Sequence, residues 1–169
     1  MTTMIADSVI PYATRNDLAE TTRSRIVELL NHRLADAVDL ATQVKVAHWN
    51  VKGANFIGLH KLFDDVHSDI GGYADLIAER VVQLGGIAEG TARIAAQRSE
   101  LREYPTGVLP GDSHVDALSV ALSALGARTR KAIDLSAAAG DQATADIFTE
   151  ITRGLDKWLW FVEAHRQEP

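Results

Sequence analysis

Four long stretches of the chain have the composition and spacing of helices. In the first, from near Asp17 to about Trp49, steps of three and four link the apolar residues Leu30, Leu34, Ala37, Ala41 and Val44. In the second, which starts near Phe56, such steps link Phe56, Leu59, Phe63, Val66, Ile70, Tyr73, Ile77, Val81 and Leu84. This spacing places side chains on one helical face. The pattern predicts amphipathic helices, and no segment indicates a β-sheet convincingly.

Turn-forming residues set the ends of the first two helices. Asp17 is a candidate N-cap for the first helix, because its carboxylate can accept hydrogen bonds from the first free backbone N–H groups. Residues 50–55 form a short turn between the two helices. Gly85 and Gly86 end the second helix, since glycine is the residue that most readily terminates one.

A long connection, residues 87–111, separates this pair of helices from the next. It contains two Pro and three Gly, and its segment TARIAAQRSE predicts a short helix. The other two long helices open at Asp112 or Ser113 and end at Gly140, and run from about Asp141 to His165. Two helices, one long crossover and two more helices predict an all-α four-helix bundle. We assign the bundle to residues 15–169, behind an N-terminal tail of residues 1–14.

Composition narrows the class of protein. The chain has 169 residues, enough for one domain, and its hydrophobic content of 46% is ordinary for a globular protein. Its net charge of −6 disfavours nucleic acid and favours cations. It contains no Cys, so any metal must be held by His and carboxylates. No apolar run has the length of a membrane span and the start lacks a secretory signal pattern, so we expect a cytoplasmic protein.

The second helix carries possible metal ligands on one side. On a wheel that turns about 100° per residue from His60, Asp64, Asp75 and Glu79 fall at about 40°, 60° and 100°. The apolar stripe centres at about 270°, so these groups point away from the core of their own bundle. A solvated polar face is the simpler alternative. However, His60 with Asp64, and Asp75 with Glu79, have the i,i+4 spacing at which two side chains can hold one ion.

The two pairs are too far apart to form one site within a chain, because Asp64 and Asp75 are roughly 16 Å apart along the axis. Their positions are nevertheless symmetric: the midpoint of 60 and 79 is 69.5, and so is that of 64 and 75. Two antiparallel copies of the helix about a two-fold axis would therefore bring one pair opposite the other, twice. Gly71 and Gly72 lie at the centre, where a close approach of two helices needs small residues.

The chemistry of these ligands limits the choice of ion. Histidine and carboxylates without thiolate suit Fe(II), Mn(II) or Zn(II), and a carboxylate-rich site favours redox iron. Burying several carboxylates at an interface without a cation would be unfavourable. Ligand chemistry alone does not choose between iron and zinc, so a redox iron site and a structural helical oligomer clamped by zinc both stay open.

Other polar residues have simpler interpretations. His48 continues the apolar stripe of the first helix and, on spacing alone, is a core histidine. Asp141 and Asp146 lie near the start of the fourth helix, where acids complement the helix dipole. Lys45 and Arg80 are expected to neutralise nearby acids. By wheel angle three more polar residues fall outside the ligand face and are expected to be solvated or paired, namely Asp65, His67 and Asp69.

Nearly the whole chain, from about Thr14 to His165, resembles one family. KVAHWNVKGANFIGLHKLFDDVHSDIGGYADLIAERVVQLGG is similar to the signature region of the Dps proteins, ferritin-like mini-ferritins named as DNA-binding proteins from starved cells. The similarity continues through LREYP and ATADIFTEITRGLDKWLWFVEAH. His-Trp-Asn, His-x3-Asp and Asp-x3-Glu are all present at the family spacing, so the match is specific.

This resemblance implies a ferroxidase site between two-fold-related subunits of a hollow dodecamer. His48 then becomes a ligand: we expect it to join Asp75 and Glu79 of its own subunit and to face His60 and Asp64 of the other. The family oxidises Fe(II), usually with hydrogen peroxide in preference to oxygen, and stores the ferric mineral. That activity suppresses hydroxyl-radical formation under oxidative stress.

Three further residues receive roles from the resemblance alone. Trp49 resembles the aromatic residue that intercepts oxidising equivalents beside the site. Asp141 and Asp146 resemble acids that line an iron-entry pore.

DNA binding is the alternative function, and the sequence disfavours it. DNA-binding members commonly use a Lys-rich tail to neutralise phosphates, whereas residues 1–14 contain no Lys or Arg. The remaining basic candidates lie near the start of the first helix: Arg15, Arg23 and Arg25. We expect weak DNA affinity and, at most, a loose association with the nucleoid.

Overall fold

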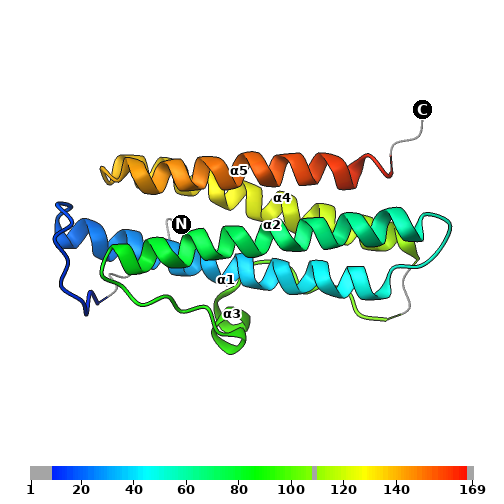
Figure 1. Cartoon of the computed structure of the whole chain (residues 1–169), viewed down its shortest axis with the longest axis horizontal. Coiled ribbons are helices and arrows are strands. Elements are labelled where there is room, and N and C mark those ends of the chain that lie inside the picture. Colours follow the sequence, from blue (N-terminus) through cyan, green and yellow to red (C-terminus); the bar gives the residue numbers. More distant parts are fainter. Residues whose placement is uncertain (1–8, 108–109, 167–169) are drawn as a thin grey trace.

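The computed structural model describes residues 9–107 and 110–166, and all its regular elements are helices (Figure 1). They are α1 (Glu20–Asn50), α2 (Phe56–Gln83), α3 (Ala92–Arg98), α4 (Gly111–Ala138) and α5 (Gln142–Glu163). Four long helices with a short one in the crossover confirm the predicted all-α bundle. Residues 1–8 of the predicted tail lie outside the described part of the chain.

The bundle consists of two helical hairpins packed against each other. In Figure 1, α1 lies along α2 and α4 lies along α5, while α3 protrudes beside α1 on the side away from α5. Apolar faces of all four long helices meet between the hairpins, where Phe63, Ile70, Leu122 and Phe148 are at most 1% exposed. Burial of large apolar side chains is the main force that holds such helices together.

The helix boundaries differ slightly from those predicted. Asp17 is not the N-cap of α1: the helix begins at Glu20, and its N-cap residue is Ala19, whose methyl side chain cannot accept a hydrogen bond. Instead, the backbone N–H of Leu18 donates to Asn16 Oδ1 at 3.0 Å, which forms a turn before the helix. The predicted end of α2 is confirmed, because Gly85 follows Leu84 with a φ of +86°, a conformation that favours glycine.

Side chains of α1 hold the crossover in place. Asn31 Nδ2 donates to the carbonyl of Ile87 at 3.1 Å, and Asn31 Oδ1 accepts from the N–H of Glu89 at 3.0 Å. At α3, Thr91 caps the helix start and Arg98 forms ion pairs with Glu28 and Glu89. The crossover is thus bonded to α1 through Asn31 and Glu28.

Arg80 neutralises a nearby acid, as predicted, but this acid lies outside its own helix. Its guanidinium turns into the protein and donates from Nη2 to both carboxylate oxygens of Asp141, at 2.8 and 3.0 Å. Arg80 is 8% exposed and Asp141 only 2%. Asp141 also caps α5, since it accepts hydrogen bonds from the backbone N–H and the hydroxyl of Thr144. This buried pair joins the end of α2 to the start of α5.

A second buried polar pair lies where the crossover meets α4. The hydroxyl of Tyr104 is 2.5 Å from Nδ1 of His114, whose side chain is 2% exposed. Burial raises the pKa of Tyr104 to about 12 and lowers the pKa of His114 below its ordinary value. Both effects keep the pair neutral, since a charge here would be poorly solvated.

The His114 pair predicts a loss of stability in mild acid. A histidine with a lowered pKa in the folded state binds protons more readily when unfolded, so stability is present above about pH 6.5 and falls as the pH drops towards the folded pKa. Urea denaturation at pH 7.5 and 5.5 should show this fall, and His114→Gln should reduce it. The exposed His165→Gln variant is the control; an equal fall in wild type and His114→Gln would contradict the assignment.

Within the described residues, none of the helices is both long enough and apolar enough to cross a membrane.

Candidate metal centre

Two histidines from neighbouring helices form the centre of the candidate site. Nδ1 of His48 lies 2.8 Å from the carbonyl oxygen of His60, and Nδ1 of His60 lies 2.9 Å from the carbonyl oxygen of His48. The rings stack with their centroids 3.8 Å apart. Because a carbonyl only accepts, each Nδ1 must carry the proton, which leaves each Nε2 with a lone pair for a metal. Both rings are thereby fixed in a metal-binding tautomer.

Asp64 is the nearest carboxylate to this pair. Its Oδ1 lies 3.8 Å from Nδ1 of His48, and it is paired with the ammonium of Lys45. Hydrogen bonding from Lys45 lowers the pKa of Asp64, so the carboxylate is ionised at neutral pH. The prediction that Lys45 neutralises a local acid is confirmed. A cation that binds Asp64 must compete with Lys45 for it.

The expected grouping of His48 with Asp75 and Glu79 is wrong. The structure places His48 against His60 and near Asp64, all in one chain. Asp75 lies eleven residues beyond Asp64 on the same helix, roughly 16 Å further along the axis. The reason is the short turn after α1, which folds α2 back along α1 and brings the end of α1 beside the start of α2.

The second pair of acids faces solvent, as the helical wheel predicts. Asp75 and Glu79 are exposed, while the opposite face of α2 buries Phe63, Ile70 and Ile77. Among residues 9–107 and 110–166, no atom outside the helix lies within 4 Å of where a Cβ on Gly71 or Gly72 would be. In the described part of the chain, no three His, Asp or Glu side chains are arranged to hold a metal ion. Within one chain, the histidine pair and the second pair of acids are therefore two separate groups.

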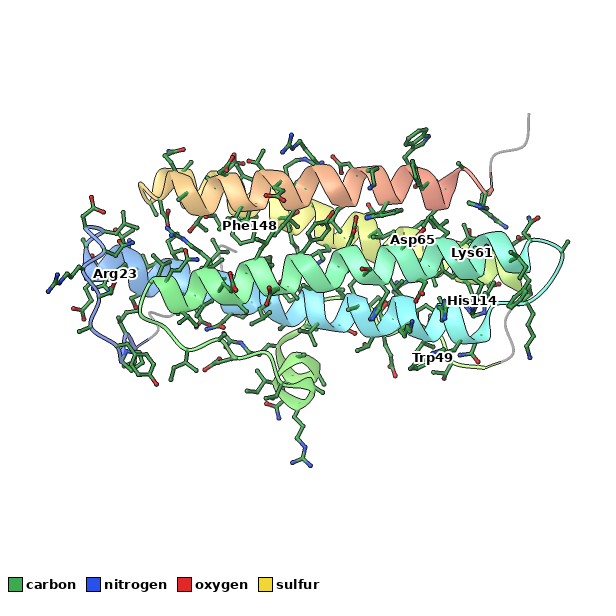
Figure 2. The ribbon with its side chains drawn as sticks, viewed as in Figure 1. Arg23, Trp49, Lys61, Asp65, His114 and Phe148 are labelled. Atoms are coloured by element: carbon green, nitrogen blue, oxygen red, sulfur yellow. The ribbon has the colours of Figure 1, made fainter. Side chains whose placement is uncertain are left out.

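The remaining predicted site residues have different surroundings. Trp49 is 66% exposed and lies at the end of the bundle that also carries Lys61 and His114 (Figure 2). Of the two predicted pore acids, only Asp146 presents its carboxylate to solvent, because Asp141 is buried against Arg80.

Two polar residues outside the ligand face have partners, as expected. Asp69 accepts a hydrogen bond from Nε1 of Trp158 at 2.9 Å. Nδ1 of His67 bonds to the carbonyl of Ala41 at 3.0 Å. Asp65, the third, is exposed.

The donor set suits iron as a substrate better than as a permanently bound ion. Imidazole and carboxylate ligands accommodate both Fe(II) and Fe(III), and the set lacks the thiolates that form closed structural sites. The carboxylates lie at the surface, where an ion can enter and leave. Zn(II) fits the same donors and would compete for them.

Comparison with known proteins identifies the family. Residues 27–168 match the model of the ferritin-like domain. The chain is 46% identical to the DNA protection during starvation protein of Agrobacterium fabrum over 157 residues, which cover 93% of this chain and 97% of that protein. Among solved structures, DpsA14 from Streptomyces coelicolor matches with a TM-score of 0.90 at 31% identity, covering 96% of each chain. Mycobacterium smegmatis Dps matches with a TM-score of 0.88 at 31% identity, covering 92% of this chain and 94% of that one. The chain belongs to the Dps family of ferritin-like proteins.

Proposed function

We propose that this protein stores and detoxifies iron, and that it oxidises Fe(II) to Fe(III) at sites shared by two chains. His48, His60 and Asp64 of one chain would bind iron together with Asp75 and Glu79 of a two-fold-related chain. The family membership supports the iron-storage role, and storage as a mineral would use a hollow dodecamer. The observation that carries the proposal is the histidine pair, whose two protons are fixed away from the metal-binding edge.

The ligands explain how the site would promote oxidation. Carboxylates stabilise Fe(III) more than Fe(II), so they favour loss of an electron from bound iron. With hydrogen peroxide, two Fe(II) ions each give one electron, and one peroxide with two protons becomes two waters. Pairing the two oxidations at one site leaves no single-electron product of peroxide, and thus no hydroxyl radical. Trp49, next to His48, is the residue proposed to intercept any oxidising equivalents that escape.

Loss of the histidine half tests this proposal. Fe(II) added without oxygen and then treated with peroxide should give a fast rise in ferric absorbance. His60→Gly with Asp64→Ala should abolish the fast phase, because both ligands disappear while the buried face of α2 is unchanged. The control variant, His165→Gly with Asp65→Ala, removes the same types of exposed or half-exposed side chain elsewhere. Normal kinetics in the first variant would refute the site assignment.

Protection of DNA is proposed to act through removal of iron and peroxide rather than through a DNA coat. The relatives' name refers to DNA protection during starvation. Of the three arginines considered for DNA binding, Arg23 is buried and donates to the carbonyls of Leu18 and Leu84. Arg15 and Arg25 are exposed. Two exposed arginines on a chain of net charge −6 favour only weak binding to phosphates.

A further inference from the structure

We propose that His67 is a docking residue: its ring enters a groove between α1 and α2 of the partner chain and fixes the register of the two half-sites. This inference rests on the proposed function, because the two-fold arrangement of the half-sites supplies the register. It assigns a role to a residue that lies outside the ligand face and takes no part in binding iron.

The groove runs along the seam between α1 and α2. Its volume is about 450 Å³, and it is lined by Leu34 and Val38 of α1 and by the crossover residues Ala88, Gly90 and Thr91. On α2 its wall consists of Gly71, Ala74, Asp75 and Ala78. Three of these four residues have no side chain beyond Cβ, so the wall is low and apolar except at Asp75. Asp75 is one of the proposed iron ligands, so the groove adjoins the acid half of the site.

His67 lies on the same edge of α2 as this groove. Positions 67, 71, 74 and 78 follow steps of four, three and four, which is one line along a helix. The bond from Nδ1 of His67 to the carbonyl of Ala41 holds the ring over the seam with α1. The side chain is half-buried, and Nδ1 is committed to the chain's own backbone. The opposite edge of the ring is therefore the part that can reach a neighbour.

The register of the half-sites brings His67 of one chain to the groove of the other. Positions 60 and 79, like 64 and 75, are centred on 69.5. A two-fold axis can pass through that point, midway between two antiparallel helices and perpendicular to both. It then brings the same edge of each helix side by side, with the chain directions reversed. Position 67 then comes level with position 72 of the partner. On the groove edge, the residues nearest to that level are Gly71 and Ala74.

This contact would fix how the two α2 helices are aligned along their length. The ring fits where the wall has only glycine and alanine, and a shift by one helical turn would bring it level with Asp75 in one direction or with the partner's His67 in the other. A bulky residue at position 74 would occupy the same space and push the helices apart. Interfaces packed to interior density lose affinity when methylene groups are added.

Two substitutions test the proposal: one fills the groove, and the other removes the ring that would enter it. Ala74→Phe should block the groove, and His67→Ala should leave it unfilled. Each variant should weaken chain association by about tenfold or more, as measured by sedimentation on dilution. The matched control is Ala127→Phe, which enlarges an exposed alanine on α4 and should associate like wild type. Circular dichroism checks folding, and His67→Ala keeps the test valid if Ala74→Phe does not fold.

Mixing the two variants separates a contact between chains from one within a chain. In a mixed dimer, the phenyl ring introduced by Ala74→Phe faces the methyl group left by His67→Ala, so the added and the missing volume compensate. The other contact of the same dimer is the native one, between His67 and Ala74. Co-assembly of His67→Ala chains with Ala74→Phe chains should therefore restore association above that of either variant alone. Visible absorbance of added Co(II) should recover in parallel, because the two half-sites meet again.

The results distinguish this inference from the proposed function. Wild-type association of Ala74→Phe, or a mixture no better than its components, would overturn the docking role even if Fe(II) oxidation is normal. Recovery of association by mixing, without Fe(II) oxidation in the wild type, would refute the proposed ferroxidase and leave the docking role standing.

Discussion

Replacing Asp75 with Asn and Glu79 with Gln is expected to slow peroxide-driven Fe(II) oxidation by about 100-fold or more. The substitutions keep size and hydrogen-bonding capacity but remove two negative charges that would stabilise Fe(III). Alterations that merely disturb metal ligands already lower metal affinity or activity by about 10- to 100-fold, so loss of two ligands should have at least the upper effect. The measurement is the initial rate of ferric absorbance after peroxide addition.

This effect is informative because both acids are far from the histidines of their own chain. If a single chain formed the site, replacing Asp75 and Glu79 would not change the rate of Fe(II) oxidation. Asp65→Asn is the matched control, since Asp65 is also an exposed acid of α2 but is not one of the proposed iron ligands. Oxidation at the wild-type rate in Asp75→Asn with Glu79→Gln would rule out the acid half of the proposed site.

The second large effect is expected on stability. Asp141→Ala should lower the free energy of unfolding by about 3–5 kcal/mol, because it leaves the buried guanidinium of Arg80 without its counter-charge and removes the cap of α5. Urea denaturation followed by circular dichroism at pH 7 measures the loss. The control is Asp156→Ala, which breaks an exposed pair with Arg130 and should change stability by no more than about 1 kcal/mol.

Acid should remove the same stabilisation in the wild type. Burial alone raises the pKa of Asp141, but hydrogen bonds from Thr144 and the charge of Arg80 outweigh it and lower the pKa below its ordinary value. The contribution is therefore complete above about pH 4 and is lost as the pH falls through the folded pKa. Equal stability losses for Asp141→Ala and Asp156→Ala would show that the buried Arg80–Asp141 pair stabilises the fold no more than an exposed pair does.

Local periodicity predicted most of the fold. The step of three and four residues locates the core face of α2, and the buried Phe63, Val66 and Ile70 lie on it. The same wheel placed Asp75 and Glu79 on the exposed face. These successes share a cause: both depend only on the geometry of one helix.

The residues that escaped prediction depend on which helix lies against which. The resemblance groups His48 with the wrong acids, and spacing along α1 cannot correct this, because it does not reveal the alignment with α2 that stacks His48 on His60. Arg80 pairs with Asp141, 61 positions further along the chain, and no local pattern indicates such a partner. A contact between distant segments becomes visible only when the chain is folded.

The contribution of a partner chain to the proposed site is inferred from the symmetric positions of its ligands. The numbering of His60, Asp64, Asp75 and Glu79 about one midpoint suggested two halves before the fold was known. The fold supports this division, since it stacks His48 on His60 near the start of α2 and leaves the acids further along the helix. The central claim is that two chains together bind the iron.

Complementation between defective chains tests that claim most directly. Chains with His60→Gly and Asp64→Ala are co-assembled in equal amounts with chains that carry Asp75→Asn and Glu79→Gln, and Fe(II) oxidation by peroxide is measured. A site made by two chains predicts that each mixed dimer regains one intact site, so random pairing restores about a quarter of the wild-type fast phase. A mixture as inactive as its separate components would contradict the shared site.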